Sequence, residues 1–185
     1  MSILNKIQSY LSNQPEQLCP IHEYAFIEPQ KLTFSAAVRE ACESNMCGRY
    51  GKCWTCPPGA GDWQKLRDHY MEYSHAFVYT TCHELEDSFD FEGMTSASKA
   101  HSELDDAFLD YLSENIDEPH ELAGAGSCSL CGDACTYPDA PCRHPDRARR
   151  SMEACGMEVT TLAKDCGIHY MNGENTVTYF SILFW

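Results

Sequence analysis

Apolar residues recur at helical spacing in three stretches of the chain. In residues 33–45 they follow Thr33, a good N-cap residue, and the pattern predicts a helix. Residues 62–74 show the same period behind Asp62, and residues 95–115 form the longest candidate helix. We interpret the apolar stripe of this last helix as a face of the core and not as a cofactor site.

Shorter apolar runs predict the strands. Residues 22–29 contain a run that ends at proline, and residues 75–85 are rich in aromatic and β-branched side chains. Near the end of the chain, residues 168–185 contain the pair Asn172 and Gly173, which predicts a turn between two strands.

The order of the elements predicts the fold class. Two short helices, 151–155 and 159–166, each end at a glycine and precede the last strands. Strands thus alternate with helices, which predicts an α/β (or α+β) fold with a single mixed sheet and flanking helices. We expect residues 1–185 to form one metal-binding domain with an N-terminal extension over residues 1–21.

Two cysteine-rich loops, residues 42–61 and 126–146, interrupt the periodic pattern. The second loop has the spacing C-x2-C-x3-C-x6-C, formed by Cys128, Cys131, Cys135 and Cys142. Zinc sites usually use two separated pairs of cysteines, whereas iron-sulfur loops often carry three close cysteines and a more distant one near proline. The spacing therefore favours a [4Fe-4S] cluster, with zinc as the alternative.

The first loop has a less regular spacing. Its cysteines are Cys42, Cys47, Cys53 and Cys56, and two prolines follow the last of them. If all four thiolates bind, the loop forms a second closed site. If Cys53 does not bind, three thiolates leave one metal position open for substrate or solvent. The spacing also allows one larger cluster shared by both loops. Arg39, Arg49 and Lys52 could offset the thiolate charge.

Composition and charge narrow the function classes. The chain has 12 cysteines and a formal net charge of -15, which argues against binding to nucleic acid or to anionic membranes. We find neither a secretory signal pattern nor an apolar stretch of transmembrane length, so we expect a soluble cytoplasmic protein. In a reducing compartment, clustered cysteines point to metal binding or catalysis more than to disulfides.

The remaining cysteines are weaker candidates for ligands. Cys82, Cys155 and Cys166 fall within or beside predicted elements, where cysteine often packs as a small hydrophobe. Cys19 and His22 form a spare pair of possible ligands. The histidines show no H-E-x-x-H arrangement, so a histidine-based catalytic zinc has little support.

Two motifs carry a resemblance to a known family. "C-x4-C-x2-Y-G-K-x-W-x-C-P-P" (42–58) and "C-x2-C-x3-C-x6-C-R-H-P" (128–145), the latter followed by "RRSMEACGMEV", resemble the predicted metal-binding proteins of domain of unknown function 2284. The resemblance covers the chain from about residue 24 onward. It implies a small, cysteine-rich protein, typical of anaerobic prokaryotes, with no established reaction.

The resemblance also implies a set of ligands. It marks Cys42, Cys47, Cys56, Cys128, Cys131, Cys135 and Cys142. The family pattern does not require cysteine at position 53, and Arg150 stands where proline is expected.

We therefore expect an iron-sulfur protein with one or two [4Fe-4S] clusters. It would act in electron transfer or deliver electrons to a partner enzyme, through a redox partner protein. A zinc-stapled binding module is the first alternative. The second is a redox enzyme that binds substrate at the open iron of a three-cysteine cluster.

Overall fold

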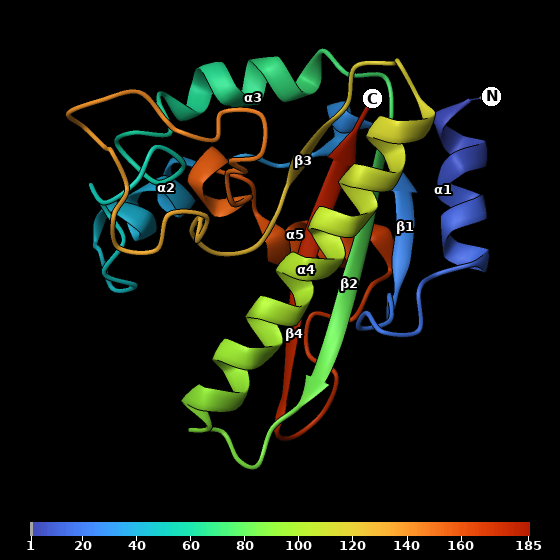
Figure 1. The fold of residues 1–185 in the computed structure, drawn as a ribbon. Helices are drawn as coiled ribbons and strands as arrows, with labels where there is room; N and C mark the ends of the chain where they lie inside the picture. The colour runs from blue at the N-terminus through green and yellow to red at the C-terminus, as the bar shows by residue number, and fades with distance from the viewer. Residues whose placement is uncertain (1) are drawn as a thin grey trace.

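The computed structural model describes residues 2–185 and is built around one four-stranded sheet (Figure 1). The strands are β1 (Tyr24–Ile27), β2 (Ala76–Glu84), β3 (Glu121–Ala123) and β4 (Thr176–Phe184), in the spatial order β1-β2-β4-β3. All three pairings of these strands are antiparallel. The fold is thus mixed α/β, as predicted, but its named strands do not form the parallel pairs that a mixed sheet would contain.

Helices cover both faces of the sheet. They are α1 (Ile3–Ser12), α2 (Ala36–Glu43), α3 (Trp63–Met71), α4 (Phe91–Asn115) and α5 (Val159–Cys166), with short 3-10 helices η1 (Pro29–Lys31) and η2 (Glu153–Cys155). Helices α1 and α4 pack on one face, and α3, α5 and η2 contribute to the core on the other. The result is a three-layer arrangement with the sheet in the middle.

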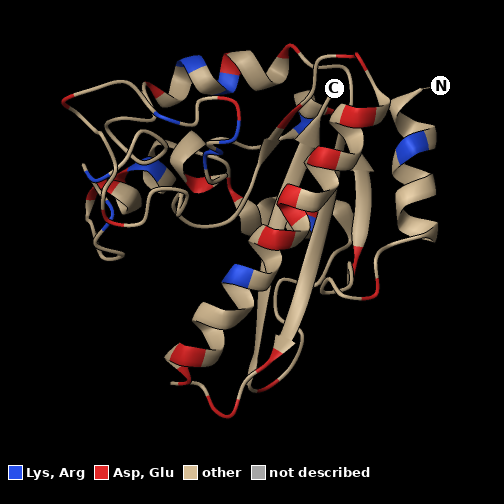
Figure 2. Ribbon diagram, viewed as in Figure 1, with Lys and Arg blue, Asp and Glu red and all other residues tan. Residues whose placement is uncertain are grey.

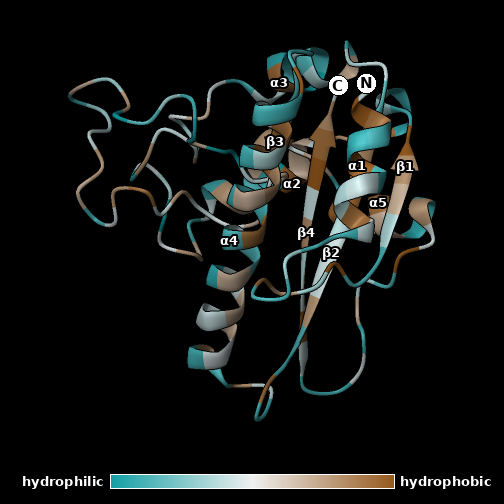
Figure 3. Ribbon diagram, turned by 45° about the vertical axis from the view of Figure 1, so that its right-hand side comes forward, coloured by the Kyte–Doolittle hydropathy of each residue, from teal (hydrophilic) through white to brown (hydrophobic). Residues whose placement is uncertain are grey.

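The period of two in β2 explains this arrangement. Phe77 and Tyr79 point toward α1 and α4, whereas Ala76 and Val78 point toward α3 and α5. All four side chains are buried, because β2 is an inner strand with helices on both sides. Figure 3 shows strongly hydrophobic residues on the strands, as expected for a sheet covered on both faces.

Two local predictions were wrong. Helix α2 begins after Ser35, whose hydroxyl accepts a hydrogen bond from the amide of Ala37, so Ser35 and not Thr33 is the N-cap. Residues 168–175 contain no strand, and the Asn172-Gly173 segment is a loop leading into β4. The side chain of Asn172 hydrogen-bonds to Thr178 and to the carbonyl of His169, which closes this loop on itself.

The segment expected to be an N-terminal extension contributes to the core. Helix α1 buries Ile3, Ile7 and Tyr10 against α4, and the ring of Tyr10 lies 4.6 Å from that of Phe108. The sheet face under α4 therefore depends on the first turns of the chain. Among residues 2–185, no helix combines the length and the apolar character needed to cross a membrane.

Candidate metal centre

The first cysteine loop lies between α2 and α3 and is held at both ends. Arg39 on α2 is buried, and its guanidinium donates to the carbonyls of Gly61 (2.9 Å) and Ala154 (3.0 Å). At the far end, the carboxylate of Asp62 accepts hydrogen bonds from two amides of the first turn of α3. Arg39 thus links α2 to Gly61 at the end of the loop, and Asp62 caps the helix that follows.

The two cysteine loops pack against each other. The backbone amide of Cys128 donates to the hydroxyl of Thr55 over 3.4 Å, and the indole of Trp54 donates to the carbonyl of Ala140 over 3.1 Å. The rings of Trp54 and Tyr137 meet edge to face, with centroids 4.9 Å apart. In Figure 1, the two loops lie together at the same end of the molecule. Segments far apart in the sequence therefore form one structure.

The loops approach each other so closely that a side chain at position 59 would not fit. A Cβ atom added to Gly59 would lie 2.6 Å from the carbonyl oxygen of Cys53 and 2.8 Å from the ring of Tyr137. Glycine at this position lets the backbone of the first loop touch the second.

Cysteines from both loops line a shared cavity. It is formed in part by Cys53 of the first loop and by all four cysteines of the second loop: Cys128, Cys131, Cys135 and Cys142. Cys53 is buried, and the thiol of Cys56 is hydrogen-bonded to its sulfur. Cys53 therefore lies where the two loops meet, a placement that the spacing of the first loop did not predict.

The other cysteines of the first loop extend this group. Burial raises the pKa of Cys42, and the nearby charges of Glu153 and Cys47 raise it further. The charge of Cys47 also adds to the effect of the Cys53 hydrogen bond and of burial in raising the pKa of Cys56. Cys47 is thus close enough to both Cys42 and Cys56 to act on their pKa values.

A negative charge on one thiol raises the pKa values of its neighbours. The hydrogen bond from Cys56 is the main factor that lowers the pKa of Cys53, to about 5, whereas the pKa of Cys56 is raised. Burial raises the pKa of Cys128, and the charges of Cys53, Cys142 and Cys131 add to this rise. Several thiolates can be held together here only if a cation compensates their mutual repulsion.

The donor set fits a thiolate-bound metal. Sulfur ligands suit zinc and iron-sulfur clusters, and the cavity gathers five of them. The Nε atom of Arg49 is buried and has no hydrogen-bond partner within residues 2–185, so a cation is directed at this region with one donor unused. Across the same residues, however, no three Cys, His, Asp or Glu side chains already stand in an arrangement that could hold a metal ion.

Arg49 also joins the two loops. Its guanidinium donates to the carbonyl of Cys128 (3.3 Å) and lies 3.6 Å from the carboxylate of Asp133. Its charge lowers the pKa of Cys56, although the larger effects of Cys53 and of burial raise it. The expectation that Arg49 offsets thiolate charge agrees with this position.

Positive charge gathers around the loops. Figure 2 shows Lys and Arg at the loop end of the molecule, while α4 is mainly acidic. Every arginine of the chain falls within residues 39–67 or 143–150. In a chain of net charge -15, this is the part of the molecule best suited to stabilise an anionic metal-thiolate centre.

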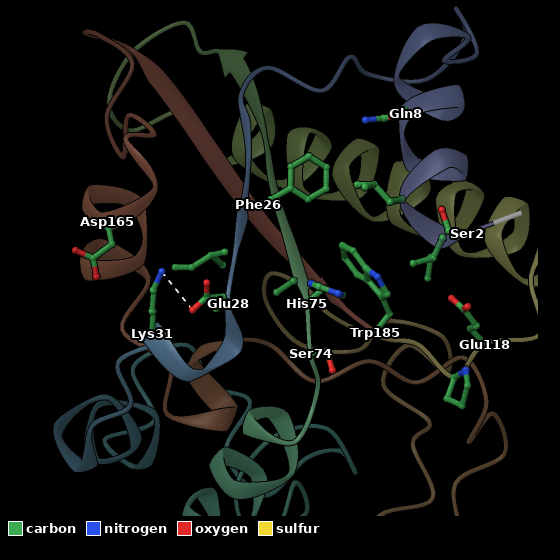
Figure 4. Close-up of a pocket in the computed structure, with 15 residues that line it drawn as sticks. Ser2, Gln8, Phe26, Glu28, Lys31, Ser74, His75, Glu118, Asp165 and Trp185 are labelled. Carbon is green, nitrogen blue, oxygen red and sulfur yellow. Dashed lines mark ion pairs between the residues drawn. The ribbon is translucent and has the colours of Figure 1, made fainter.

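A larger cavity lies away from the cysteine loops. It has a volume of about 1320 Å³ and lies between α1 and β1. Figure 4 shows Phe26 and Trp185 on its wall and the ion pair between Lys31 and Glu28 at one end. None of the residues that line it is a cysteine or stands in either loop. We therefore take the cysteine loops, and not the cavity between α1 and β1, as the candidate metal centre.

The remaining cysteines are placed apart from the loops' cavity. Cys155 is fully buried in the core, as predicted for a small hydrophobe, whereas Cys82 and Cys166 are half-buried. The thiol of Cys19 donates to the carbonyl of Ala100, and the ring of His22 hydrogen-bonds to Asn172. Cys19 and His22 thus have separate partners.

Sequence reasoning missed two residues that hold the loops together, Thr55 and Trp54. His144, which stands beside a candidate ligand in the sequence, lines the shared cavity, and its amide donates to the sulfur of Cys142. The W-x-C-P-P motif contained Trp54, but nothing in the sequence paired it with Ala140.

Comparisons with known proteins agree with a metal-binding role for the chain. No curated protein and no solved structure matches the chain. A family model described as "Predicted metal-binding protein (DUF2284)" matches residues 25–185, which include both cysteine loops and all four strands except the first residue of β1. The chain therefore belongs to the DUF2284 family of predicted metal-binding proteins.

Proposed function

We propose that the two loops hold iron-sulfur chemistry and that the protein transfers single electrons to or from a partner protein. The observation that carries the proposal is the shared cavity, where Cys53 of the first loop joins the four cysteines of the second. Their C-x2-C-x3-C-x6-C spacing is closer to iron-sulfur loops than to the paired cysteines of zinc sites.

The ligands divide into two groups that meet at Cys53. One group consists of Cys128, Cys131, Cys135 and Cys142, and the other of Cys42, Cys47 and Cys56 with Cys53 as the candidate fourth member. Because Cys53 lines the cavity of the first group and accepts a hydrogen bond from Cys56, the proposal places the two groups side by side. A bound [4Fe-4S] cluster would supply reversible one-electron chemistry at this place.

The chain's own residues provide the setting for that chemistry. Arg49 and the other arginines near the loops lower the cost of gathering negative charge. The backbone amides of the loops can donate to sulfur, as the amide of His144 does to Cys142 over 3.4 Å. All twelve cysteines are free thiols, which suits the reducing cytoplasm in which we place the protein.

A second candidate function rests on a separate observation. Beside the shared cavity lies an open hollow of about 550 Å³, whose walls include Trp54, Cys142 and Arg150. Its volume is in the range of small-molecule sites. If the first loop holds its cluster through three cysteines and leaves one metal position open, the protein would be a redox enzyme, and this hollow, which Trp54 of that loop also lines, would admit the substrate.

Metal analysis of anaerobically purified protein tests the proposal. We expect iron and acid-labile sulfide in near-equal amounts and broad visible absorption that bleaches on reduction. A colourless protein with zinc and neither iron nor sulfide would overturn the proposal and favour a zinc-stapled module. In that case chelation should unfold the protein, because structural zinc contributes folding free energy.

A further inference from the structure

A chain of buried polar side chains crosses the core between the sheet and α4. It runs from His83 through Thr81, His101 and Ser181 to Asp105, with successive distances of 2.9, 2.8, 2.9 and 2.9 Å. The four inner residues are at most 2% exposed, and His83 is half-buried. One end of the chain therefore reaches toward solvent, and the other ends on a buried carboxylate.

The donors along this chain can all point the same way. An ionised Asp105 only accepts, so the hydroxyl of Ser181 donates to it and must itself accept from Nε2 of His101. Nδ1 of His101 then accepts from the hydroxyl of Thr81, which accepts from Nε2 of His83. Thr81, His101 and Ser181 thus each accept one hydrogen bond and donate the next, which is the requirement for passing a proton along hydrogen bonds.

Charges from several elements face Asp105. Tyr79 of β2 donates to its second oxygen over 2.6 Å, and Nε of Arg149 lies 4.0 Å from the first. Helix α4 adds His101 and Asp106, which pairs with Arg149, while Tyr10 of α1 and Cys19 lie near enough to interact with its charge. Burial raises the pKa of Asp105, although His101 and Arg149 oppose the rise.

Burying such a network of polar side chains in a core has a free-energy cost. Burying polar groups stabilises a fold less than apolar packing of the same volume unless their hydrogen bonds are complete, and a buried carboxylate is the most costly member. Burial lowers the pKa of His101, which weakens the ring as a counter-ion for Asp105, although the charge of Asp105 opposes this shift. A merely structural role leaves the ordered run of donors toward one carboxylate unexplained.

At its inner end, Asp105, the hydrogen-bonded network lies next to the second cysteine loop. Asp105, Arg149 and the segment Gly124–Leu130 line one small cavity of about 50 Å³, and that segment contains Cys128. A Cβ atom added to Gly124 would lie 2.9 Å from the Asp105 carboxylate, so the backbone that leads to Cys128 passes directly over it. The cavity is polar and large enough for water.

We propose that His83, Thr81, His101 and Ser181 form a proton path to Asp105 and that proton uptake at Asp105 accompanies electron uptake at the loops. This inference rests on the proposed electron-transfer function. When a one-electron donor protein adds one electron at the loops, one proton from water reaches His83, each hydrogen along the path shifts by one bond, and the Asp105 carboxylate becomes a neutral carboxyl group. Oxidation at the loops returns the proton to water. One negative charge and one positive charge thus enter together.

Potentiometric titration over a range of pH tests the proposal. In the metal-loaded wild-type protein, we expect the reduction potential to fall by about 59 mV for each tenfold decrease in proton concentration, the value for one proton per electron. Asp105→Asn should remove this dependence. Asp106→Asn, on the same helix and next to the same arginine, should keep it. A wild-type potential that does not change with pH would overturn the proposal.

Infrared spectroscopy gives a second readout that does not depend on a variant folding. The reduced-minus-oxidised difference spectrum of the wild-type protein should contain the carbonyl stretch of a newly protonated carboxyl group, and its absence would contradict proton uptake at Asp105. The variant His101→Gln keeps Asp105, the proton acceptor, but removes the imidazole ring through which the proton passes. It should therefore slow the appearance of this band at least tenfold. An unchanged rate in that variant would overturn the path.

The two proposals fail in different ways. A protein that contains no iron and no sulfide overturns the electron-transfer function together with this inference. A protein with intact clusters, reversible reduction and a pH-independent potential overturns the proton path alone.

Discussion

Cys53 has a position that distinguishes it from every other cysteine of the chain. It belongs to the first loop by sequence, lines the cavity of the second loop in space, and accepts a hydrogen bond from Cys56. The lowered pKa of its thiol favours the ionised form that metals bind. Whether it serves as a ligand therefore decides if the first loop forms a closed four-thiolate site.

Replacing Cys53 tests this directly. We expect Cys53→Ser to lower the iron and sulfide content per chain and to weaken the visible absorption, because a serine hydroxyl is a poor ligand for these metals. Cys82→Ser, on β2 and outside both loops, should leave both properties unchanged. If Cys53→Ser keeps its full iron content and spectrum, Cys53 is not a ligand and the first loop leaves one metal position open.

Candidate ligands were easier to select from the sequence than their grouping in space. Spacing alone selected the four cysteines of the second loop, because three thiols within eight residues converge only where the chain wraps around a central object such as a metal. The same reasoning could not reveal that Thr55 and Trp54 fasten the first loop to the second. These contacts join residues 73 and 86 positions apart, and no local pattern records such pairs.

At the scale of elements, the start of α3 determines where the first loop ends. The carboxylate of Asp62 accepts hydrogen bonds from the amides of Gln64 (2.8 Å) and Lys65 (3.2 Å), which the first turn of a helix would otherwise leave without partners. The side chain of Asp62 thus fixes the C-terminal boundary of the first cysteine loop, next to Gly61, which Arg39 holds.

Removing this cap should destabilise the protein without unfolding it. We expect Asp62→Ala to lower the free energy of unfolding by about 1 kcal/mol, the usual value for loss of an N-cap. Asp62→Asn keeps an accepting oxygen and should cost much less. Urea unfolding followed by circular dichroism measures both variants, and equal losses in the two would show that the hydrogen bonds of the cap are unimportant here.

The long or strongly patterned elements were predictable, and the short ones were not. Residues 75–85 contain β2, and residues 159–166 are α5, because clear periodicity or a terminal glycine marks them. In contrast, β3 has three residues, too few to show a period, and α4 begins at Phe91, earlier than its apolar stripe suggests. Both Thr33 and Ser35 are common N-cap residues, and the amide of Ser35 also donates to the carbonyl of Gly156, a tertiary contact that the local pattern does not reveal.

At the scale of the whole molecule, folding buries thiol and phenol groups and thereby favours their neutral forms. Burial raises the pKa of Cys155 from its usual value of 9.0 to about 12, and it also raises that of Tyr10 to about 12. Between pH 9 and 12 the folded protein therefore holds more protons than the unfolded chain does. Stability must fall as the pH rises through this range.

Alkaline unfolding checks this expectation. For Cys155 alone, the loss between pH 9 and 12 is on the order of 4 kcal/mol. Cys155→Ala removes the ionising thiol, so its free energy of unfolding should decline less steeply with pH than that of the wild type. The comparison uses chemical denaturation at a series of pH values. Parallel curves for the two proteins would mean that Cys155 does not ionise on unfolding.

The junction of the two cysteine loops has a consequence for biosynthesis. The amide of Cys128 meets Thr55, which stands 73 positions earlier, and the sheet is completed only by β4, at the end of the chain. Closing so long a stretch of chain has an entropic cost that is recovered only when the core has formed. A nascent chain on the ribosome thus displays the thiols of the first loop long before the second loop exists. A centre that uses ligands from both loops can consequently be completed only after the second loop has been synthesised and has reached the first.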